Sequence, residues 1–246
     1  MGVDRAEKRN AFDLQTIREL AEAYETLGDD PELRAGVLFA HGDHFSAGLD
    51  LAEVGPEVAA KGPAALAGGG KYDPFGVWAP PVPKPVVMAV NGIAFTLSIE
   101  LALAADIVIA AEGVRFRQLE IGRGIMPFGG ATMRAPEKLG WGNAMRFLLT
   151  AEELGAQEAL RIGLVQEVVP AGEHVPRARA LAALIAKQAP IAVQATLASA
   201  RIARRDGDEA AVAHLRSVLP TIMASEDAAE GLKSFVERRE AKFNGR

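Results

Sequence analysis

The chain has 246 residues, of which 49% are apolar and 24% are charged, and it contains no cysteine. This apolar fraction excludes a disordered chain, and the absence of cysteine excludes a disulfide scaffold, a thiol nucleophile and a cysteine zinc site. With 32 acidic and 27 basic side chains, the net charge of −5 argues against nucleic-acid and polybasic membrane-binding proteins. The first ten residues lack the apolar core of a signal peptide, so we expect a cytoplasmic protein.

The first third of the chain predicts a helix, a strand and a long loop. Asp13 is typical of a helix N-cap, and apolar residues at helical spacing continue to Leu27, so a helix is expected as far as Gly28. A buried strand is expected at residues 36–40. In residues 55–85, 13 of 31 positions are Gly or Pro, which predicts a long irregular loop of the kind that borders substrates.

Residues 86–111 form an apolar stretch long enough to span a bilayer. Glu100 lies near its centre, where a carboxylate costs about 2.5–3.5 kcal/mol on insertion scales, and Asn91-Gly92 and Asp106 interrupt the stretch. We therefore expect a globular core in which one glutamate lies in the most apolar region. The expected elements are a strand at 86–90, a helix at 97–104 and strands at 106–110 and 114–116.

The rest of the sequence is mostly helical. After a Gly-rich loop at 122–130, helices are expected at 132–139, 141–149 and 156–162, with a strand at 164–169. Four Ala-rich amphipathic helices are then expected at 173–188, 191–205, 208–223 and 228–239. Strands that alternate with helices, followed by helices alone, predict an α/β core at residues 1–189 and a helical C-terminal region at 190–246.

Three common motifs are too weak here to support a function. His41 and His44, with Asp43 between them, have loose spacing for metal ligands and lie in a turn, so we predict no metal site. No serine lies in a nucleophile elbow of the G-x-S-x-G type. Gly122 and Gly124 do not complete a dinucleotide-binding fingerprint, because the third glycine is misplaced.

A stronger signal for acid–base chemistry comes from three segments. Residues 45–51 carry small side chains where a ligand could reach the backbone, Glu100 is in the first turn of the buried helix, and Glu120 precedes the Gly-rich loop. A lone buried glutamate is more often a paired structural group, but two of them beside accessible backbone favour catalysis. Unpaired N–H groups near Leu97, with a second donor from Leu49, would suit an oxygen that becomes negatively charged.

Six segments of the chain resemble the crotonase superfamily, specifically its enoyl-CoA hydratases. They are RAEKRNAF at 5–12, FSAGLDL at 45–51, PVVMAVNG at 85–92, ELALAAD at 100–106, FRQLE at 116–120 and FVERR at 235–239. They occur in the family's order over nearly the whole chain. The resemblance implies an α/β fold of repeated ββα units in a spiral, with a helical C-terminal region that forms homotrimers or hexamers.

The resemblance also implies an activity, the reversible syn addition of water to a 2-enoyl-CoA thioester. The thioester oxygen would lie between the backbone N–H groups of Leu49 and Leu97. Glu100 would activate the water and Glu120 would exchange a proton with the α-carbon. Many relatives with other chemistry lack one or both glutamates, which favours hydration. No separate cofactor and no metal are expected, because coenzyme A enters as part of the substrate.

Further contacts with the substrate follow from the same resemblance. The residues assigned to substrate or coenzyme A binding are Lys8, Arg9, Ala47, Asp50, Leu51, Lys242 and Phe243. Lys8 and Arg9 match the segment beside the nucleotide, and Lys242 and Phe243 match a segment near the adenine. Since isolated basic residues are usually solvated surface charges, that alternative stays open for each of them.

The chain departs from the hydratase pattern in three places. Thr96-Leu97-Ser98 stands where hydratases usually have a run of glycines, and Phe128 replaces a glycine of the segment that helps to hold the water. Fewer residues than usual precede Arg5, so we expect a shortened N-terminal hairpin. Two alternatives therefore remain: an isomerase, hydrolase or lyase of the same family, and a catalytically silent acyl-CoA-binding protein.

Overall fold

A five-stranded parallel sheet lies at the centre of the computed structural model, which describes all residues from 1 to 246. Its strand order is β1–β2–β3–β5–β8, and every neighbouring pair is parallel. The strands are β1 (Gly2–Val3), β2 (Gly36–Ala40), β3 (Val86–Val90), β5 (Ile107–Ala111) and β8 (Glu167–Val169).

A second, smaller sheet carries the segments that reach the candidate site. It consists of β4 (Ile93–Phe95), β6 (Arg115–Arg117) and β7 (Leu154–Gly155), with β4 parallel to β6 and β6 antiparallel to β7. Both β4 and β6 end directly before residues of the site, since Thr96 follows the first and Gln118 follows the second.

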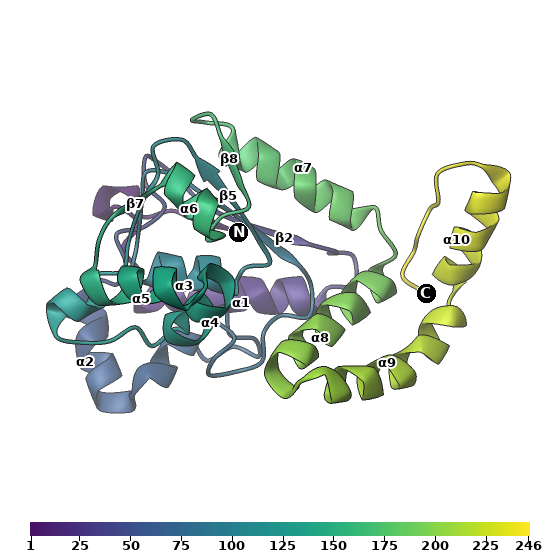
Figure 1. Cartoon of the computed structure of the whole chain (residues 1–246), viewed down its shortest axis with the longest axis horizontal. Helices are drawn as coiled ribbons and strands as arrows, with labels where there is room; N and C mark the ends of the chain where they lie inside the picture. Colours follow the sequence, from purple (N-terminus) through teal and green to yellow (C-terminus); the bar gives the residue numbers. More distant parts are fainter.

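Helices cover both faces of the central sheet. The α-helices are α1 (Leu14–Asp29), α2 (Leu51–Lys61), α3 (Leu97–Ala104), α4 (Ala131–Leu139), α5 (Trp141–Thr150), α6 (Ala156–Ile162), α7 (His174–Ala186), α8 (Pro190–Asp206), α9 (Asp208–Met223) and α10 (Glu226–Glu237). Three short 3-10 helices are η1 (Ala6–Lys8), η2 (Pro63–Ala67) and η3 (Glu120–Arg123). Figure 1 shows α7 on one side of the strands and α1, α3 and α4 on the other.

The alternation of side chains along β3 explains this layering. All five residues of β3 are buried, because successive side chains point to opposite faces of a covered sheet. Met88 and Val90 belong to the large core cluster on the α3 side, whereas Val87 and Ala89 pack with Ala178 of α7.

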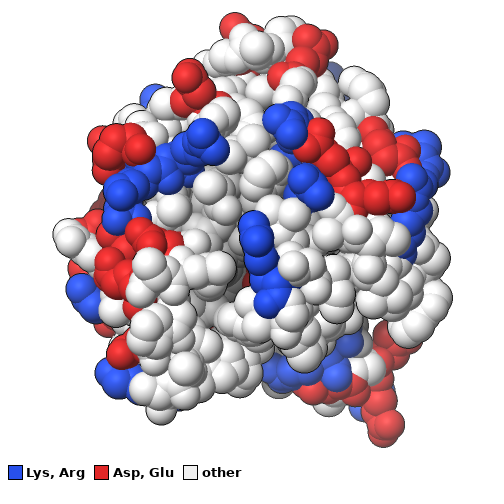
Figure 2. Space-filling model, turned by 90° about the vertical axis from the view of Figure 1, so that its left-hand side faces the viewer, with Lys and Arg blue, Asp and Glu red and all other residues white.

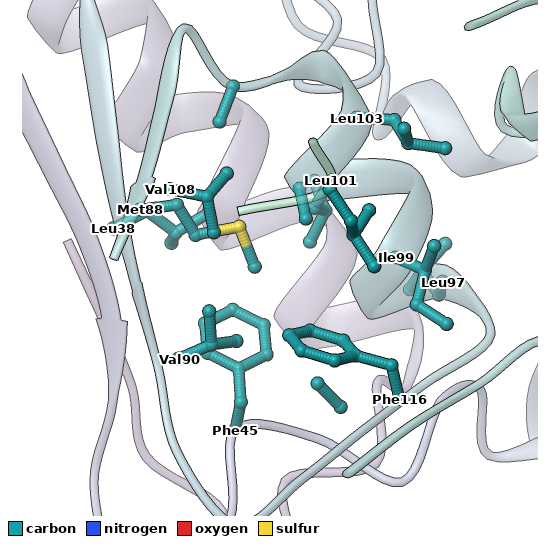
Figure 3. Close-up of a cluster of buried hydrophobic side chains, with 14 of the residues drawn as sticks. Leu38, Phe45, Met88, Val90, Leu97, Ile99, Leu101, Leu103, Val108 and Phe116 are labelled. Atoms are coloured by element: carbon teal, nitrogen blue, oxygen red, sulfur yellow. The ribbon is translucent and has the colours of Figure 1, made fainter. Parts of the chain in front are cut away.

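Helix α3 is apolar on nearly every side and is buried for that reason. Figure 3 shows Leu97, Ile99 and Leu101 of α3 gathered with Phe45 and Phe116, which come from outside the helix. These side chains are at most 2% exposed. Glu100 therefore lies in the most apolar part of the molecule, as the sequence predicts.

The C-terminal helices extend away from the sheet (Figure 1). The expected boundary between residues 189 and 190 falls at the junction of α7 and α8. Arg201 joins α8 to the core, since it donates to the carbonyl oxygen of Val82 at 2.6 Å and pairs with Asp106 at 3.2 Å. No single helix has the length and apolar character needed to cross a membrane, although the bent pair α7–α8, with a 107° angle, meets a length and composition criterion.

Most predicted elements are confirmed within one to three residues, but the expected loop at 55–85 is partly wrong. Helix α2 continues through Gly55 and Pro56. A proline has a helical φ and removes only one donor, and Val54 and Val58, four residues apart, pack against the core. Strands β4 and β7 were not expected, because two or three residues are too few to show a period.

Candidate active site

A cavity of about 150 Å³ lies at the N-terminal end of α3, between the loop at residues 47–51 and η3. It unites the four residues that the sequence singles out for chemistry, namely Glu100, Glu120, Leu49 and Leu97. The remaining lining residues are Ala47, Leu51, Thr96, Leu119, Arg123, Ile125 and Phe128. Glutamates separated by 20 positions in the sequence thus face one small space.

Two backbone N–H groups at this cavity have no acceptor in the protein. Leu97 is the first residue of α3, which has no side-chain cap, and its N–H group has no partner within the helix. The N–H group of Leu49 is likewise absent from the hydrogen bonds of its loop, although both neighbours, Gly48 and Asp50, donate. Unpaired donors at a buried helix start are suited to a ligand oxygen that carries negative charge.

The loop that carries Leu49 is held by the segment near the N-terminus. Phe12 and Leu49 form a parallel bridge, in which Phe12 donates to the Gly48 oxygen at 2.8 Å and Asp50 donates to the Phe12 oxygen at 2.8 Å. Ala47 donates to the Arg9 oxygen at 2.9 Å. This pairing brings the 5–12 and 45–51 segments together, as their joint resemblance to one family implies.

Gly48 and Thr96 bring the two donor peptides into contact. Gly48 has φ +103°, and a side chain there would collide with Oγ1 of Thr96, so only glycine fits. Thr96 has φ 50° and ψ −110°, outside the allowed regions of a β-branched residue. Such strain costs about 1–3 kcal/mol and persists only where neighbouring structure imposes it.

One carboxylate oxygen of Glu100 is fixed by hydrogen bonds, and the other is not. Its Oε1 accepts hydrogen bonds from the Gly129 N–H at 2.7 Å and the Ala131 N–H at 3.1 Å, whereas Oε2 accepts none. The side chain is 2% exposed, and burial raises its pKa from 4.5 to about 7, against the lowering effect of the two N–H donors. The charge of Glu120 raises the pKa of Glu100 further.

Glu120 opens η3 on the other side of the cavity. Its Oε1 accepts from the Gln118 side chain at 2.9 Å, whereas its Oε2 is buried with no hydrogen-bond partner. Burial raises the pKa of Glu120 from 4.5 to about 7, against the lowering effect of its own backbone N–H group, the Gln118 side chain and the Leu119 N–H group. A buried oxygen without a partner is costly, and a proton on it or a bound donor would remove that cost.

Glu100 and Glu120 can therefore act as a base and an acid, respectively. Two carboxyl groups with pKa values of about 7 exchange protons readily at neutral pH, where an ordinary glutamate is a permanent anion. The two N–H donors on Glu100 stabilise its ionised form, while the isolated oxygen of Glu120 favours a protonated form. The arrangement supports a base at Glu100 and a proton carrier at Glu120.

The mouth of the cavity is apolar with a single basic group. Ile125 and Phe128 line both this cavity and a neighbouring wide surface pocket, which is also lined by Ile121 and Met126. Arg123 lines the cavity, and it belongs to no ion pair of the structure. Figure 2 shows a hollow near the middle of the face on the α2 and α5 side, with a basic side chain at its edge and charges of both signs around it.

The residues assigned to coenzyme A fall into two places. Ala47 and Leu51 line the cavity; Asp50 lies between them and pairs with Arg5 at 3.3 Å. Lys8 and Arg9 are exposed beside the Ala47 loop. By contrast, Lys242 and Phe243 are not part of this cavity within the chain: the Phe243 oxygen accepts a hydrogen bond from Arg34, which also binds the end of α7 through the Ala186 oxygen.

Several residues of the site were not anticipated. Gln118, Gly129 and Ala131 bind the two glutamates, and Arg134 donates to the oxygens of Gly129 and Gly76, which ties two loops together behind Glu100. The Gly-rich character of 122–130 was the available signal, but it could not show which N–H groups reach Glu100. The side chains form no cluster of three or more metal ligands.

The chain is similar to known proteins over its whole length. The family model for enoyl-CoA hydratase/isomerase matches residues 1–246. Carnitinyl-CoA dehydratase of Escherichia coli strain K12 is 36% identical over 97% of this chain and 92% of its own length. The crystal structure of a probable enoyl-CoA hydratase/isomerase from Mycobacterium abscessus is 51% identical, with a TM-score of 0.94, over 100% of this chain and 94% of that one.

An enoyl-CoA hydratase from Mycobacterium tuberculosis H37Rv gives a further structural match, with a TM-score of 0.88, 32% identity and coverage of 100% of this chain and 94% of that one. The expected crotonase-like α/β fold is thereby confirmed. The match over the full length, together with the two-glutamate cavity, shows that the chain belongs to the enoyl-CoA hydratase/isomerase family.

Proposed function

We propose that the protein is an enoyl-CoA hydratase that adds water reversibly to a short 2-enoyl-CoA thioester. The observation that carries this proposal is the cavity itself, in which two glutamates with pKa values of about 7 face the uncapped start of α3. A passive binding protein would not need two such carboxyl groups beside an oxyanion site, and the assay below separates a hydratase from a double-bond isomerase.

The proposed mechanism uses one proton transfer at each glutamate. The thioester oxygen accepts hydrogen bonds from the N–H groups of Leu49 and Leu97, which makes the β-carbon electrophilic and stabilises the negative charge that develops on oxygen. Glu100, ionised, removes a proton from water as its oxygen bonds to the β-carbon. Glu120, protonated, gives a proton to the α-carbon, and proton exchange between the two groups and solvent restores the starting state.

The size of the cavity supports a short acyl group. About 150 Å³ is the volume of a cavity that holds a benzene molecule, so the part of the acyl group nearest the glutamates that the cavity can enclose is about four to six carbon atoms long. Leu97 and Phe128, which stand where the family has glycines, help to limit this space. Coenzyme A would be held outside the cavity as part of the substrate, with Lys8 and Arg9 near its phosphates, and no other cofactor is needed.

We also propose that the active form is a homotrimer, or a hexamer of two trimers. Helices α9 and α10 expose large apolar side chains, including Met223 at 68%, Leu232 at 69% and Phe235 at 82%. Exposed apolar surface of this kind marks an association site. Lys242 and Phe243 lie beside α10, so an assembly through this region could bring them to a neighbouring subunit's substrate.

The test is a direct assay of hydration. Purified protein is mixed with 2-enoyl-CoA thioesters of four to twelve carbon atoms, a range chosen around the estimate of about four to six, and the loss of absorbance of the conjugated double bond is followed. We expect turnover that is fastest with the short substrates and needs no added metal. Unchanged absorbance for every chain length would refute the proposal, and a loss of absorbance without the added mass of water in the product would identify an isomerase, which moves the double bond out of conjugation.

A further inference from the structure

We propose that the hydroxyl group of Thr96 is a third hydrogen-bond donor to the thioester oxygen, beside the N–H groups of Leu49 and Leu97. This inference rests on the proposed function, because it assigns a further residue to the same reaction. Thr96 lines the cavity together with both backbone donors and both glutamates.

The first argument is that, of the polar groups of Thr96, only the hydroxyl has no hydrogen-bond partner within the protein. Its N–H group donates to the Arg117 oxygen at 2.9 Å, and its carbonyl oxygen accepts from Ile99 at 2.8 Å and from Glu100 at 3.4 Å. Its Oγ1 neither caps α3 nor takes part in any other hydrogen bond of the structure. The backbone is therefore fixed on both sides, while the hydroxyl of this cavity-lining residue is left without a partner.

The second argument is the position of Oγ1. It lies against the Cα atom of Gly48, so closely that any side chain at that position would collide with it. Gly48 is bonded to Leu49, and Thr96 is bonded to Leu97, so Oγ1 marks the contact between the two residues that precede the backbone donors. An oxygen placed between those donors would also be next to this hydroxyl.

The third argument is that threonine is a costly choice at this position. With φ 50° and ψ −110°, Thr96 adopts a conformation that glycine tolerates and a β-branched residue does not. The four other non-glycine residues with positive φ have values of 51° to 55°, and three of them, Arg9, Ala151 and Arg238, have ψ in the ordinary left-handed region. Thr96 is thus strained at a functional site, where strain is commonly part of the mechanism.

The cavity also contains an independent sign of an absent ligand. Oε2 of Glu120, on a side chain that is 8% exposed, is buried without a hydrogen-bond partner. This oxygen, the Thr96 side chain and the two backbone donors belong to residues that line the same cavity. The alternative is that Thr96 merely fills space against Gly48, in which case its methyl group would be sufficient.

The experiment compares Thr96→Val, which keeps the shape and loses the hydroxyl, with Thr96→Ser, which keeps the hydroxyl. For hydration of a short 2-enoyl-CoA we expect Thr96→Val to lower kcat about 100-fold, the smaller end of the loss for one oxyanion donor. KM should change little, because the hydrogen bond strengthens as charge develops on oxygen. Thr96→Ser should retain most of the activity.

A second measurement does not depend on turnover. Acetoacetyl-CoA forms an enolate that absorbs in the near ultraviolet, and its apparent pKa on the protein reports how well the site stabilises a negative oxygen. A 100-fold loss of stabilisation would raise that pKa by about two pH units in Thr96→Val but not in Thr96→Ser. Thr96→Gly, which also relieves the strain, should behave like Thr96→Val and melt at the same or a higher temperature.

The outcomes separate this inference from the proposed function. If Thr96→Val keeps both kcat and the pKa of the bound probe, the inference is wrong. If the unmodified protein hydrates no enoyl-CoA but the probe pKa still rises in Thr96→Val, the hydratase proposal fails and the hydroxyl donor stands. If Thr96→Val does not fold, the comparison of Thr96→Gly with Thr96→Ser decides; if acetoacetyl-CoA does not bind, kcat for hydration decides, and an unchanged kcat in Thr96→Val refutes the inference.

Discussion

Folded proteins usually bury apolar side chains and expose charged ones. Helix α3 and helices α9–α10 depart from this rule in opposite ways. The α3 region is buried and apolar, yet it contains Glu100, a carboxyl group that is 2% exposed. The α9–α10 region is largely exposed, yet it presents Phe235 at 82% exposure. A buried charge and an exposed aromatic side chain both cost free energy in an isolated chain.

The difference between the two regions fits the two roles proposed for them, catalysis for the α3 region and subunit assembly for the α9–α10 region. In the α3 region the cost is connected to chemistry, because burial gives the glutamates pKa values that suit proton transfer. In the α9–α10 region the cost disappears when another protein surface covers the side chains. The contrast can be tested by removing each unfavourable feature and asking whether chemistry or assembly is lost.

The largest expected effect is the loss of the base. Glu100→Gln keeps the size of the side chain and an oxygen for the Gly129 and Ala131 donors, but it cannot take a proton. We expect kcat for hydration to fall by about 10²–10⁴-fold. Glu112→Gln, at an exposed glutamate, is the control and should be as active as the unmodified protein. An active Glu100→Gln variant would contradict the assigned role.

The next effect comes from moving a backbone donor without changing any polar side chain. Gly48→Ala forces a side chain against Thr96 Oγ1 at φ +103°, so the Leu49 N–H group, the Thr96 hydroxyl or both must shift. A loss of about 10²–10³-fold in kcat is expected for one oxyanion donor. Gly55→Ala in α2 is the control, because a side chain there meets no other atom within 4 Å. Equal activity of the two variants would remove Leu49 from the oxyanion site.

A third test uses stability instead of activity. The pKa of Glu120 is raised from 4.5 to about 7, so the folded protein holds more protons than the unfolded chain between these pH values. The free energy of unfolding therefore falls as the pH rises through this window. Glu120→Gln removes this loss, and we expect it to be more stable than the unmodified protein by about 3 kcal/mol at pH 8.

The same comparison at low pH is the internal control. Below pH 4.5 the glutamate is protonated in both the folded and the unfolded state, so the two proteins should unfold at nearly the same denaturant concentration. Urea unfolding at pH 4 and pH 8 measures both differences. A stability difference that does not depend on pH would mean that the pKa of Glu120 is not raised.

The smallest effect concerns the exposed apolar region. Phe235→Glu places a charge on α10 where we expect a subunit contact, and each interface would lose about 2 kcal/mol of apolar burial. Light scattering after size exclusion should show a smaller assembly, while far-ultraviolet circular dichroism stays unchanged. Lys233→Glu, also exposed on α10, is the charge control. An unmodified protein that is already monomeric would contradict the trimer proposal.

The sequence was sufficient to predict the elements whose residues show a clear period or composition. Helix α3 and strand β3 are such cases, since Leu97–Ala104 and Val86–Val90 are nearly all apolar. The donors at Leu49 and Leu97 and the two glutamates also come together as the motifs imply. The prediction failed where local and tertiary effects compete, as in α2, which tolerates Pro56 because packing of Val54 offsets a lost hydrogen bond.

Other parts of the site leave no trace in a single sequence. The sequence around residue 96 does not predict a positive φ at a threonine. That conformation results from the paths of β4 and α3 on either side. Likewise, the hydrogen bonds from Gly129 and Ala131 to Glu100 join residues about thirty positions apart. Only the three-dimensional path of the chain makes them neighbours.

The proposed use of main-chain N–H groups as oxyanion donors has a consequence for evolution and engineering. A peptide N–H group is present whatever the side chain, so the side chain of Leu49 can vary while its donor is kept. Leu97 is different, since it is 2% exposed in the core and its replacement would leave a void. Libraries that diversify Leu49, Leu51 and Ile125, and leave Leu97 intact, should therefore alter acyl preference while retaining the underlying reaction.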